Sequence, residues 1–565
     1  MSQSTFTPTP EQSTALDLYR QGGSLRLIAG AGTGKTSTLR LLAEHTPPGQ
    51  RLLYMAYNKA IQLDAQREFP RNTTVVTSHA LAYRAVGRRY RQRLNGPRVP
   101  ARQVADMLRI THTQKVGDKV LLPPQLARLA NLMVSRFCIS ADPGLLPQHL
   151  PPVNGIAPGP ERDELTALLL PHARAIWEDL QRPTGRFRFE HDHYLKLYAL
   201  TNPVVAERVI LYDEAQDATP VTANLVHQWQ NAGKQVVIVG DSSQAIYGWR
   251  GAVDSMGMFN VPNEATLSKS FRFGPSIAAE ANKWLTLLDA PIRLSGHTPI
   301  PSRLAPTMER PDAVLCRSNM GAITELMKQQ TGDTSTAIVG GGAELRALAK
   351  AAEELSRGGG TMHPDLCAFR SWGEVREYAQ TEEGADLSPF VDVIDSYGAA
   401  TVVAVIDACV DERDADVAIS TAHKSKGREW DRVKIADDFR APHGDDLLAA
   451  EELMLSYVAV TRARKELDRG PLGWVDRFSQ TGANAPRPAP VAPTAPAPVA
   501  DQDSGGWQSA SSVASDMRPV KSVFIGDTAR ALRELSAADH VTPQQWLNDQ
   551  IARAAASSRA VREAG

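Results

Sequence analysis

Short apolar runs alternate with segments of helical periodicity over the first 90 residues. The runs are LRLIAG (25–30), RLLYMAY (51–57) and TTVVTS (73–78), and apolar residues three or four apart follow each of them. Runs this short and rich in Leu or β-branched residues are typical of strands buried on both faces. Because strands and helices alternate, the pattern predicts an α/β fold with a parallel sheet covered by helices.

The alternation stops near residue 90 and resumes near residue 205. The intervening segment has helical patterns, many Arg residues and Pro-rich connectors, which predicts a helical insertion. Strand patterns return in ERVILYDEAQD (207–217) and KQVVIVGD (234–241). We therefore expect residues 1–90 and 205–265 to form one lobe around an insertion at 90–205.

A second alternating region predicts a second α/β lobe, made of residues 265–340 and 410–481. Its candidate strands are DAVLCRSN (312–319), STAIVGG (335–341), DVAISTAH (416–423) and RVKIADDF (432–439). The stretch 340–410 has irregular helical patterns and predicts a small, reduced insertion. ELDRGPLGWV (466–475) is more polar than a closing strand, so we expect that strand to be short or missing.

The composition changes after residue 482. Prolines among alanines predict an extended linker over 482–515. Residues 516–565 read as a short strand and two helices, which loosely resembles a ribbon-helix-helix module that dimerises and binds DNA through its strand. A partner-docking hairpin or a tail folded onto the rest of the chain fits the same pattern, so a protein partner and self-association both stay open.

Charge and cysteine content exclude several classes of protein. The 565 residues carry 62 basic and 63 acidic side chains, so any nucleic-acid surface must be local. No basic leader precedes an apolar run, and no run approaches the about 18 apolar residues of a membrane span, which predicts a cytoplasmic protein without membrane contact. The 4 cysteines form no CxxC pair, which argues against a zinc ribbon or a disulfide framework.

AGAGTGKTSTL (29–39) connects a predicted strand to a predicted helix and matches the GxxxxGK[ST] phosphate-binding loop. Such a loop binds phosphates through backbone N–H groups at a helix N-terminus. Lys35 supplies a charge to the β- and γ-phosphates, and Thr36 supplies a hydroxyl for Mg²⁺. The rest of the predicted loop site is Ala31, Gly32, Thr33, Gly34 and Ser37.

Two further segments predict the remainder of a hydrolytic site. Asp213 and Glu214 end the apolar run VILY, where a carboxylate can hold Mg²⁺ and its neighbour can orient or deprotonate a water. In GDSSQAIYGWRGA (240–252), Gln244 can sense the γ-phosphate, while Trp249 and Tyr247 offer faces for stacking a base. Core packing is the alternative for Tyr247.

The motifs, taken in the order in which they occur along the chain, resemble those of superfamily 1 helicases of the UvrD/Rep group. The resemblance extends over residues 12–467. The F-box DNA helicase branch is the most similar, and no F-box-like segment is expected ahead of the motifs. The resemblance implies two RecA-like lobes (1A and 2A) with insertions 1B and 2B, and ATP with Mg²⁺ as cofactors. It also implies an ATP-dependent DNA helicase or translocase that moves 3′ to 5′ on single-stranded DNA and acts at junctions with duplex.

The resemblance adds residues to the predicted ATP site. Gln12 stands where the family reads adenine, and SFRFGPSIA (270–278) places Phe271 on the adenine and Arg272 as an arginine finger. STAHKSKGREWDRV (420–433) places Glu429 near the ribose, and LSYVAVTRARKEL (455–467) places Arg462 as the second finger.

The resemblance also implies a set of DNA contacts from four motifs. This set is Tyr57, Asn58, Lys59, Thr77, His79, Tyr247, Trp249, Arg250 and His423. The implied context is DNA repair or recombination control in the cytoplasm, at the nucleoid. Two alternatives stay open: a translocase that displaces proteins with weak unwinding, which the reduced insertion favours, and a DNA-binding regulator whose ATPase is a switch.

Two polar clusters in the helical insertion have structural alternatives. Arg residues in RAVGRRYRQRLNGPRVPARQ (84–103) form either a phosphate-binding patch or a solvated helix face. His191 and His193 suggest a metal site, but without a nearby Cys we expect core or helix-cap roles instead.

Overall fold

The computed structural model describes residues 7–94, 96–97, 99–153, 155–329, 334–361, 363, 366, 369–380, 387–442 and 449–479. The chain separates into two compact units, Met1–Val491 and Ala492–Gly565, and every described residue belongs to the first. The predicted linker 482–515 and the predicted module 516–565 lie outside the described residues.

The first lobe is built on a six-stranded parallel sheet in the order β3-β2-β6-β7-β1-β8. Its strands are β1 (Leu25–Ala29), β2 (Leu52–Ala56), β3 (Thr73–Thr77), β6 (Val209–Tyr212), β7 (Gln235–Gly240) and β8 (Asn263–Leu267). The first five match the predicted runs, and β8 is an edge strand that the sequence analysis did not anticipate. The parallel sheet confirms the predicted α/β class.

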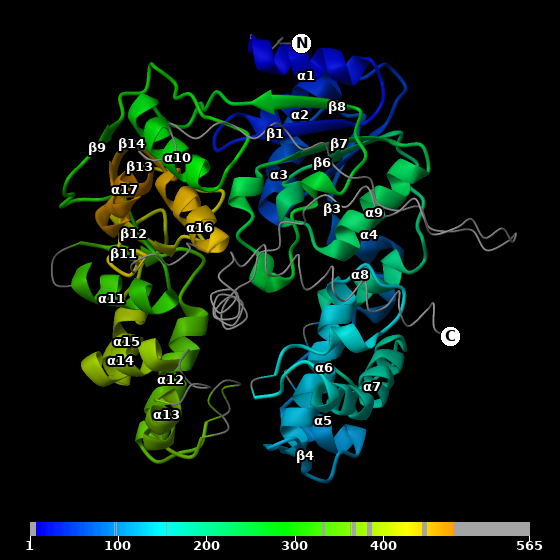
Figure 1. The fold of residues 1–565 in the computed structure, drawn as a ribbon, viewed down its shortest axis with the longest axis vertical. Coiled ribbons are helices and arrows are strands. Elements are labelled where there is room, and N and C mark those ends of the chain that lie inside the picture. Colours follow the sequence, from blue (N-terminus) through cyan, green and yellow to red (C-terminus); the bar gives the residue numbers. More distant parts are fainter. Residues whose placement is uncertain are drawn as a thin grey trace, which may run out of the picture. The chain divides into compact units, whose positions relative to one another are not determined.

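Alternate residues of these strands enter two different cores. Leu52 and Tyr54 pack on one face of the sheet, and Leu53 and Met55 pack on the other. The surrounding helices include α1 (Pro10–Arg20), α2 (Lys35–Glu44), α3 (Lys59–Glu68), α4 (Ser78–Ala85) and α9 (Pro220–Asn231) (Figure 1). Burial on both faces explains why the central strands read as continuous apolar runs.

Further helices fill the stretch between α4 and β6. They are α5 (Ala101–Leu108), α6 (Pro123–Ile139), α7 (Pro160–Leu180) and α8 (His191–Ala199), with an antiparallel hairpin of β4 (Gln114–Val116) and β5 (Lys119–Leu121). Their core is continuous with the sheet face that carries Leu53 and Met55. Arg93, from the Arg-rich segment, is turned inward, where it pairs with Asp179 at 3.3 Å and donates to the carbonyl of Phe187.

The second lobe repeats the architecture with a six-stranded parallel sheet in the order β11-β12-β10-β13-β14-β9. Its strands are β9 (Arg303–Leu304), β10 (Ala313–Cys316), β11 (Thr336–Ile338), β12 (Val417–Thr421), β13 (Trp430–Ile435) and β14 (Ala463–Asp468). The expectation that the closing strand is short or missing is wrong, because β14 has 6 residues. Its polar side chains pair with neighbouring strands, as in Lys465–Asp431 at 2.7 Å and Arg303–Glu466 at 2.9 Å.

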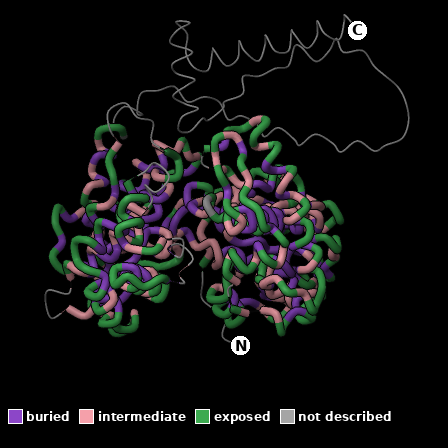
Figure 2. The backbone as a smooth tube through the Cα atoms, turned by 90° about the horizontal axis from the view of Figure 1, so that it is seen from below, coloured by how far each residue is buried: buried purple, intermediate pink, exposed green. Residues whose placement is uncertain are grey.

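Helices cover both faces of the second sheet. They are α10 (Pro275–Leu287), α11 (Asn319–Gln329), α12 (Ala343–Ser356), α13 (Trp372–Ala379), α14 (Ser388–Tyr397), α15 (Ala399–Asp407), α16 (Ala450–Val460) and α17 (Val475–Ser479). Figure 2 shows the buried segments enclosed by exposed ones. Among the described helices, none alone is long and apolar enough to cross a membrane. Only the consecutive helices α14 and α15 together reach the length and apolar composition of a membrane span, and they are bent by 88° relative to each other.

His193 has the predicted helix-cap role. It is buried in the first turn of α8, and its Nδ1 accepts a hydrogen bond from the backbone N–H of Glu190 at 2.9 Å. The described residues contain no cluster of three His, Cys, Asp or Glu side chains suited to a metal ion. Burial, partly opposed by Asp192, lowers the pKa of His193 from 6.5 to about 4.

This pKa predicts a loss of stability in mild acid. The unfolded chain binds a proton at His193 below pH 6.5 while the folded chain stays neutral down to about pH 4, so stability falls across that window. His193→Gln keeps a capping acceptor and removes the titration. Between pH 6.5 and about pH 4, the free energy of unfolding measured by urea denaturation should fall by up to about 3 kcal/mol more in the wild type than in this variant. Parallel losses in both proteins would contradict the prediction.

Candidate active site

A cavity of about 420 Å³ lies at the carboxyl ends of the first sheet's strands and is closed by residues of the second lobe. Its polar and charged lining comes from segments far apart in the sequence. The lining residues are Gly32, Thr33, Gly34, Lys35, Thr36, Ser37, Tyr57, Asn58, Ile61, Glu214, Asp217, Gln244, Tyr247, Phe271, Arg272, Lys426, Gly427, Glu429 and Arg462. Most of the predicted ATP-site residues therefore meet at one cavity.

The backbone of the phosphate-loop candidate favours glycine at two positions. Gly32 and Gly34 have φ of +71° and +79°, a region that disfavours side chains. A Cβ on Gly32 would lie 2.5 Å from the Cβ of Arg272 and 2.6 Å from Oγ of Ser270. No side chain caps the start of α2 at Lys35, so its first N–H groups are left for an anion. These features fit a bound triphosphate.

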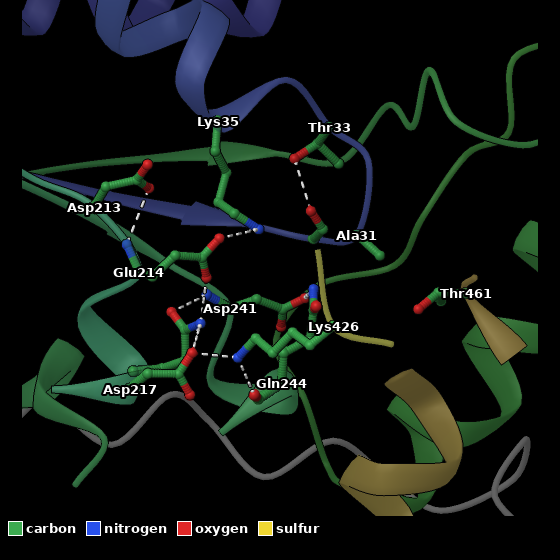
Figure 3. Close-up of polar contacts among 12 residues, drawn as sticks. Ala31, Thr33, Lys35, Asp213, Glu214, Asp217, Asp241, Gln244, Lys426 and Thr461 are labelled. Carbon is green, nitrogen blue, oxygen red and sulfur yellow. Dashed lines mark hydrogen bonds and ion pairs between the residues drawn. The ribbon is translucent and has the colours of Figure 1, made fainter. Parts of the chain in front are cut away.

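The two predicted acids take different positions. Glu214 lines the cavity, and its Oε1 lies 3.8 Å from Nζ of Lys35 (Figure 3). Asp213 is buried and is not part of the cavity lining. Its carboxylate accepts hydrogen bonds from Tyr54 Oη at 2.5 Å and from the Glu214 N–H at 3.0 Å. Of the predicted magnesium ligands, only Thr36 reaches the cavity wall.

The two acids also differ in protonation. Burial raises the pKa of Asp213, and the charge of Glu214 raises it further. Burial acts to raise the pKa of Glu214 as well, but the charges of Lys35 and then Lys426 outweigh it and hold that pKa below its ordinary value. Glu214 therefore loses its proton at a lower pH than Asp213 and carries a negative charge at neutral pH.

Two cations of the second lobe contact the first lobe at this cavity. Lys426 forms an ion pair with Asp217 and donates to the carbonyl of Gln244 at 2.6 Å (Figure 3). Arg462 is fully buried, and its Nη2 lies 3.4 Å from Oε1 of Gln244. Burial, and then the neighbouring Arg272, lower the pKa of Arg462 to about 9. Both lobes thus meet at Gln244, the predicted γ-phosphate sensor.

Arg272 and Glu429, predicted for different parts of the nucleotide, are paired with each other. Arg272 Nε donates to Glu429 Oε2 at 2.7 Å, and its Nη1 donates to the carbonyl of Thr461 at 3.2 Å. Phe271 beside them lines the cavity with a ring that is 39% exposed. An exposed aromatic face at a cavity wall suits stacking against a base.

Gln12 lies beside the loop and does not line the cavity. Its Oε1 accepts from the Thr9 N–H at 3.0 Å, and its Nε2 donates to Oγ1 of Thr38 at 3.1 Å. The side chain therefore closes a capping box at α1 and fixes α1 against α2. Beyond these contacts, Oε1 can accept one more hydrogen bond and Nε2 can donate one more.

The turn 240–252 connects the cavity to the predicted DNA contacts. The rings of Tyr247 and Tyr57 are stacked with centroids 6.0 Å apart, and both side chains line the cavity. Tyr247 Oη also donates to the carbonyl of His423 at 3.1 Å, and Arg250 lies over the Tyr247 ring at 5.7 Å. The side chain of Trp249 lies outside the described residues.

The other predicted DNA residues have local structural roles. Asn58 and Thr77 cap the N-termini of α3 and α4 through bonds from the N–H groups of Ile61 and Ala80, and Lys59 donates to Gln62. His79 pairs with Asp192 of α8 at 2.9 Å, which joins the first lobe to its insertion. Of these residues, Asn58 lines the cavity together with Tyr247 of the turn, whereas Lys59, Thr77 and His79 are not part of the cavity lining.

The sequence analysis missed four polar residues of the site: Asp217, Asp241, Lys426 and Tyr457. Tyr457 is the most informative, because its buried hydroxyl donates to Asp241 Oδ2 at 3.1 Å and accepts from the Ala31 N–H at 3.2 Å. One side chain of α16 thus contacts both the phosphate loop and the end of β7. A polar ring inside the apolar run LSYVAV was the available signal.

Family models match most of the segments that form this site. A model described as an AAA domain matches residues 12–250, and a model described as a UvrD-like helicase C-terminal domain matches residues 376–468. The first range contains Lys35, Glu214 and Gln244. The second contains Lys426 and Arg462.

Curated relatives match over most of the chain. F-box DNA helicase protein 1 of Schizosaccharomyces pombe is 30% identical over 519 residues, 81% of this chain and 57% of the relative. F-box DNA helicase 1 of Gallus gallus is 28% identical over 506 residues, 81% of this chain and 48% of the relative. The chain therefore spans about half the length of these relatives. A solved arterivirus nonstructural protein 10 helicase matches with a TM-score of 0.28 and 12% identity, covering 82% of this chain and 64% of its own, which supports no argument.

Tyr457→Phe tests the hydroxyl that joins α16 to the phosphate loop. The change leaves the Ala31 N–H without its acceptor in a buried position, so we expect a loss of about 1–3 kcal/mol in the free energy of unfolding. Tyr397→Phe, on the exposed face of α14, is the matched control and should stay within about 0.5 kcal/mol of the wild type. Urea denaturation followed by circular dichroism measures both. Equal stability of Tyr457→Phe and the wild type would refute this assignment.

Proposed function

Because the chain belongs to the UvrD-like superfamily 1 helicases, we propose that it is an ATP-driven motor on DNA. Single-stranded DNA and its junctions with duplex are the proposed substrates, and 3′ to 5′ the proposed direction. The proposed setting is DNA repair or recombination control. The observation that carries the proposal is the cavity in which side chains of both lobes surround a phosphate-binding loop.

The residues of the cavity suit ATP hydrolysis. Lys35 and the first N–H groups of α2 bind the phosphates, and Thr36, on the cavity wall, is a proposed ligand of Mg²⁺, which would neutralise charge on the transferred phosphoryl group. Asp213 stays the second proposed ligand, although its carboxylate is bonded to Tyr54 and the Glu214 N–H in this structure. Glu214 orients a water and accepts its proton. Arg272 and Arg462 then stabilise the charge that develops in the transition state.

The contacts between the lobes supply a route from hydrolysis to movement. Lys426 and Arg462 contact Gln244, which begins the turn that carries Tyr247 and Arg250. A change at the phosphates therefore alters contacts on both sides of the cleft. Alternating grip by the two lobes would turn this change into steps along a strand. Stacking of bases on Tyr247 and Trp249 is the proposed grip, worth about 1–3 kcal/mol per base.

A translocase that displaces proteins with weak unwinding is the second candidate function. In the described residues, α12 to α15 share one hydrophobic core with β10, β11 and β12. This insertion therefore packs as part of the second lobe, without a core of its own. An insertion of this kind favours movement along a strand over active separation of a duplex. A regulator whose ATPase is a switch stays the third possibility.

Lys35→Ala should abolish ATP hydrolysis that single-stranded DNA stimulates in the wild type. The ammonium group is the cation that the loop offers to the phosphates, so we expect a fall in kcat of at least about 100-fold. Lys350→Ala, on the exposed face of α12, is the control and should keep the wild-type rate. Steady-state phosphate release with and without single-stranded DNA measures all three proteins. Hydrolysis indifferent to DNA in the wild type would exclude the motor.

Two assays on the wild type separate the candidate functions. Displacement of a strand from a forked duplex is expected of a helicase, and removal of a bound protein from single-stranded DNA without strand displacement is expected of the second candidate. Deletion of residues 482–565 addresses the regulator, which should lose selectivity of DNA binding, whereas a motor should keep DNA-stimulated turnover.

A further inference from the structure

Gln216 is a buried polar residue next to the site, and the proposed mechanism of hydrolysis assigns it no role. It lies in the 3-10 turn Ala215–Asp217 that follows Glu214, and its relative exposure is 1%. A buried carboxamide is costly unless its groups are hydrogen-bonded. The partners of Gln216 therefore indicate what the residue does.

The carboxamide of Gln216 is bonded on both sides. Its Oε1 accepts from the backbone N–H of Asp241 at 3.0 Å. Its Nε2 donates to Oε2 of Glu214 and lies 3.2 Å from Oδ2 of Asp217. A flipped amide would turn its oxygen toward two carboxylates and its nitrogen toward an N–H group, so the orientation is determined by these partners.

Glu214 needs such a support because its backbone is strained. Its φ of +52° and ψ of 45° lie in the left-handed region, which costs a residue with a side chain about 1–3 kcal/mol. Its carboxylate also lies among charged groups of both lobes. These are Lys35 from α2, Asp213 from the end of β6, Asp217 from the 3-10 turn, Lys426 from the loop after β12 and Arg462 from the end of α16.

The end of β7 is shaped to admit this carboxamide. A Cβ at Gly240 would lie 2.4 Å from Oε1 of Gln216 and 3.3 Å from its backbone nitrogen. Gly240 has no positive φ, so its own backbone does not demand glycine. A Cβ here would also lie 2.8 Å from Sδ of Met256, so the close approach of both side chains, with Gln216 the nearer, explains a residue without a side chain at this position.

We propose that Gln216 is a positioning residue that holds the carboxylate of Glu214 and connects it to the turn 240–252. This role rests on the proposed ATPase function. The connection runs from Glu214 through Gln216 to the N–H of Asp241, whose Oδ2 accepts from Nε2 of Gln244 at 2.6 Å. Movement of the turn on binding DNA thereby changes the position of Glu214, the group that accepts the proton of the attacking water.

Gln216→Met tests the proposal with little change in volume. It removes both donors and the acceptor while filling the same space. We expect kcat with DNA to fall about 10- to 100-fold, the range found when a group that orients a reacting residue is removed. The KM for ATP should stay within about twofold, because Gln216 does not line the cavity. Stimulation by single-stranded DNA should also decrease.

The matched control is Gln230→Met in α9. Its Nε2 donates to Ser24 and to the carbonyl of Asn260, both at 2.9 Å, so it loses comparable bonds far from the cavity. We expect wild-type kcat and wild-type stimulation for this control. Circular dichroism of each variant checks that the fold is retained.

A double-mutant cycle separates positioning from general damage. In a Glu214→Gln background, Gln216→Met should cause no further fall in the rate of phosphate release, because the group it positions no longer acts as a base. A merely structural role would reduce the rate by the same factor in both backgrounds and would overturn the proposal. If single-stranded DNA stimulates Gln216→Met as strongly as the wild type, the proposed connection between Glu214 and the turn 240–252 is refuted.

The failures of the two proposals are distinguishable in the same measurements. If the wild type and Gln230→Met hydrolyse ATP with stimulation by DNA and Gln216→Met does likewise, the role of Gln216 is refuted and the motor stands. If the wild type and the control both fail to hydrolyse ATP, the proposed function is refuted, and the role of Gln216 with it.

Discussion

The burial of charge around Glu214 is the constraint on which the site depends. Three carboxylates of the first lobe lie within five residues of one another: Asp213 and Asp217 are buried, and Glu214 is partly buried at the cavity wall. Ionised carboxylates in such surroundings are costly unless cations compensate them. Lys35 comes from the same lobe, and Lys426 comes from the other. A cation of the second lobe therefore compensates part of the negative charge on the acids of the first lobe.

In the proposed motor, this dependence links closure of the cleft to the charge state of Glu214. The charge of Lys426 contributes to keeping Glu214 ionised, and its ion pair with Asp217 exists only while the lobes are in contact. Burial acts in the opposite direction on both acids. Separation of the lobes would remove a compensating cation and admit water at the same time. The proposed function therefore couples hydrolysis to domain movement through charge and solvation at a few atoms.

Hydrogen bonds then carry this coupling along the edge of the first sheet. Asp241 is the centre of the network, because its carboxylate accepts from Gln244 and Tyr457 and its N–H donates to Gln216. Tyr457 also reaches the phosphate loop at Ala31. Every one of these atoms is buried, so none of the partners can be exchanged for water without cost. The network explains why side chains from distant motifs behave as a unit.

The sequence by itself determined the two α/β lobes, nine of the strands and the glycine-containing loop proposed to bind phosphate. Most of those strands are buried on both faces and read as apolar runs, and the loop depends on a local pattern of glycines around Lys35. The edge strands β8 and β9 were missed because edge positions need few apolar residues, and β14, between β13 and β9, was underestimated because its side chains are largely polar. Only the tertiary structure decided which polar residues meet at Glu214. Lys426, Tyr457 and Asp241 lie in motifs visible in the sequence, but their pairing is a contact between segments about 200 residues apart, which no local periodicity encodes.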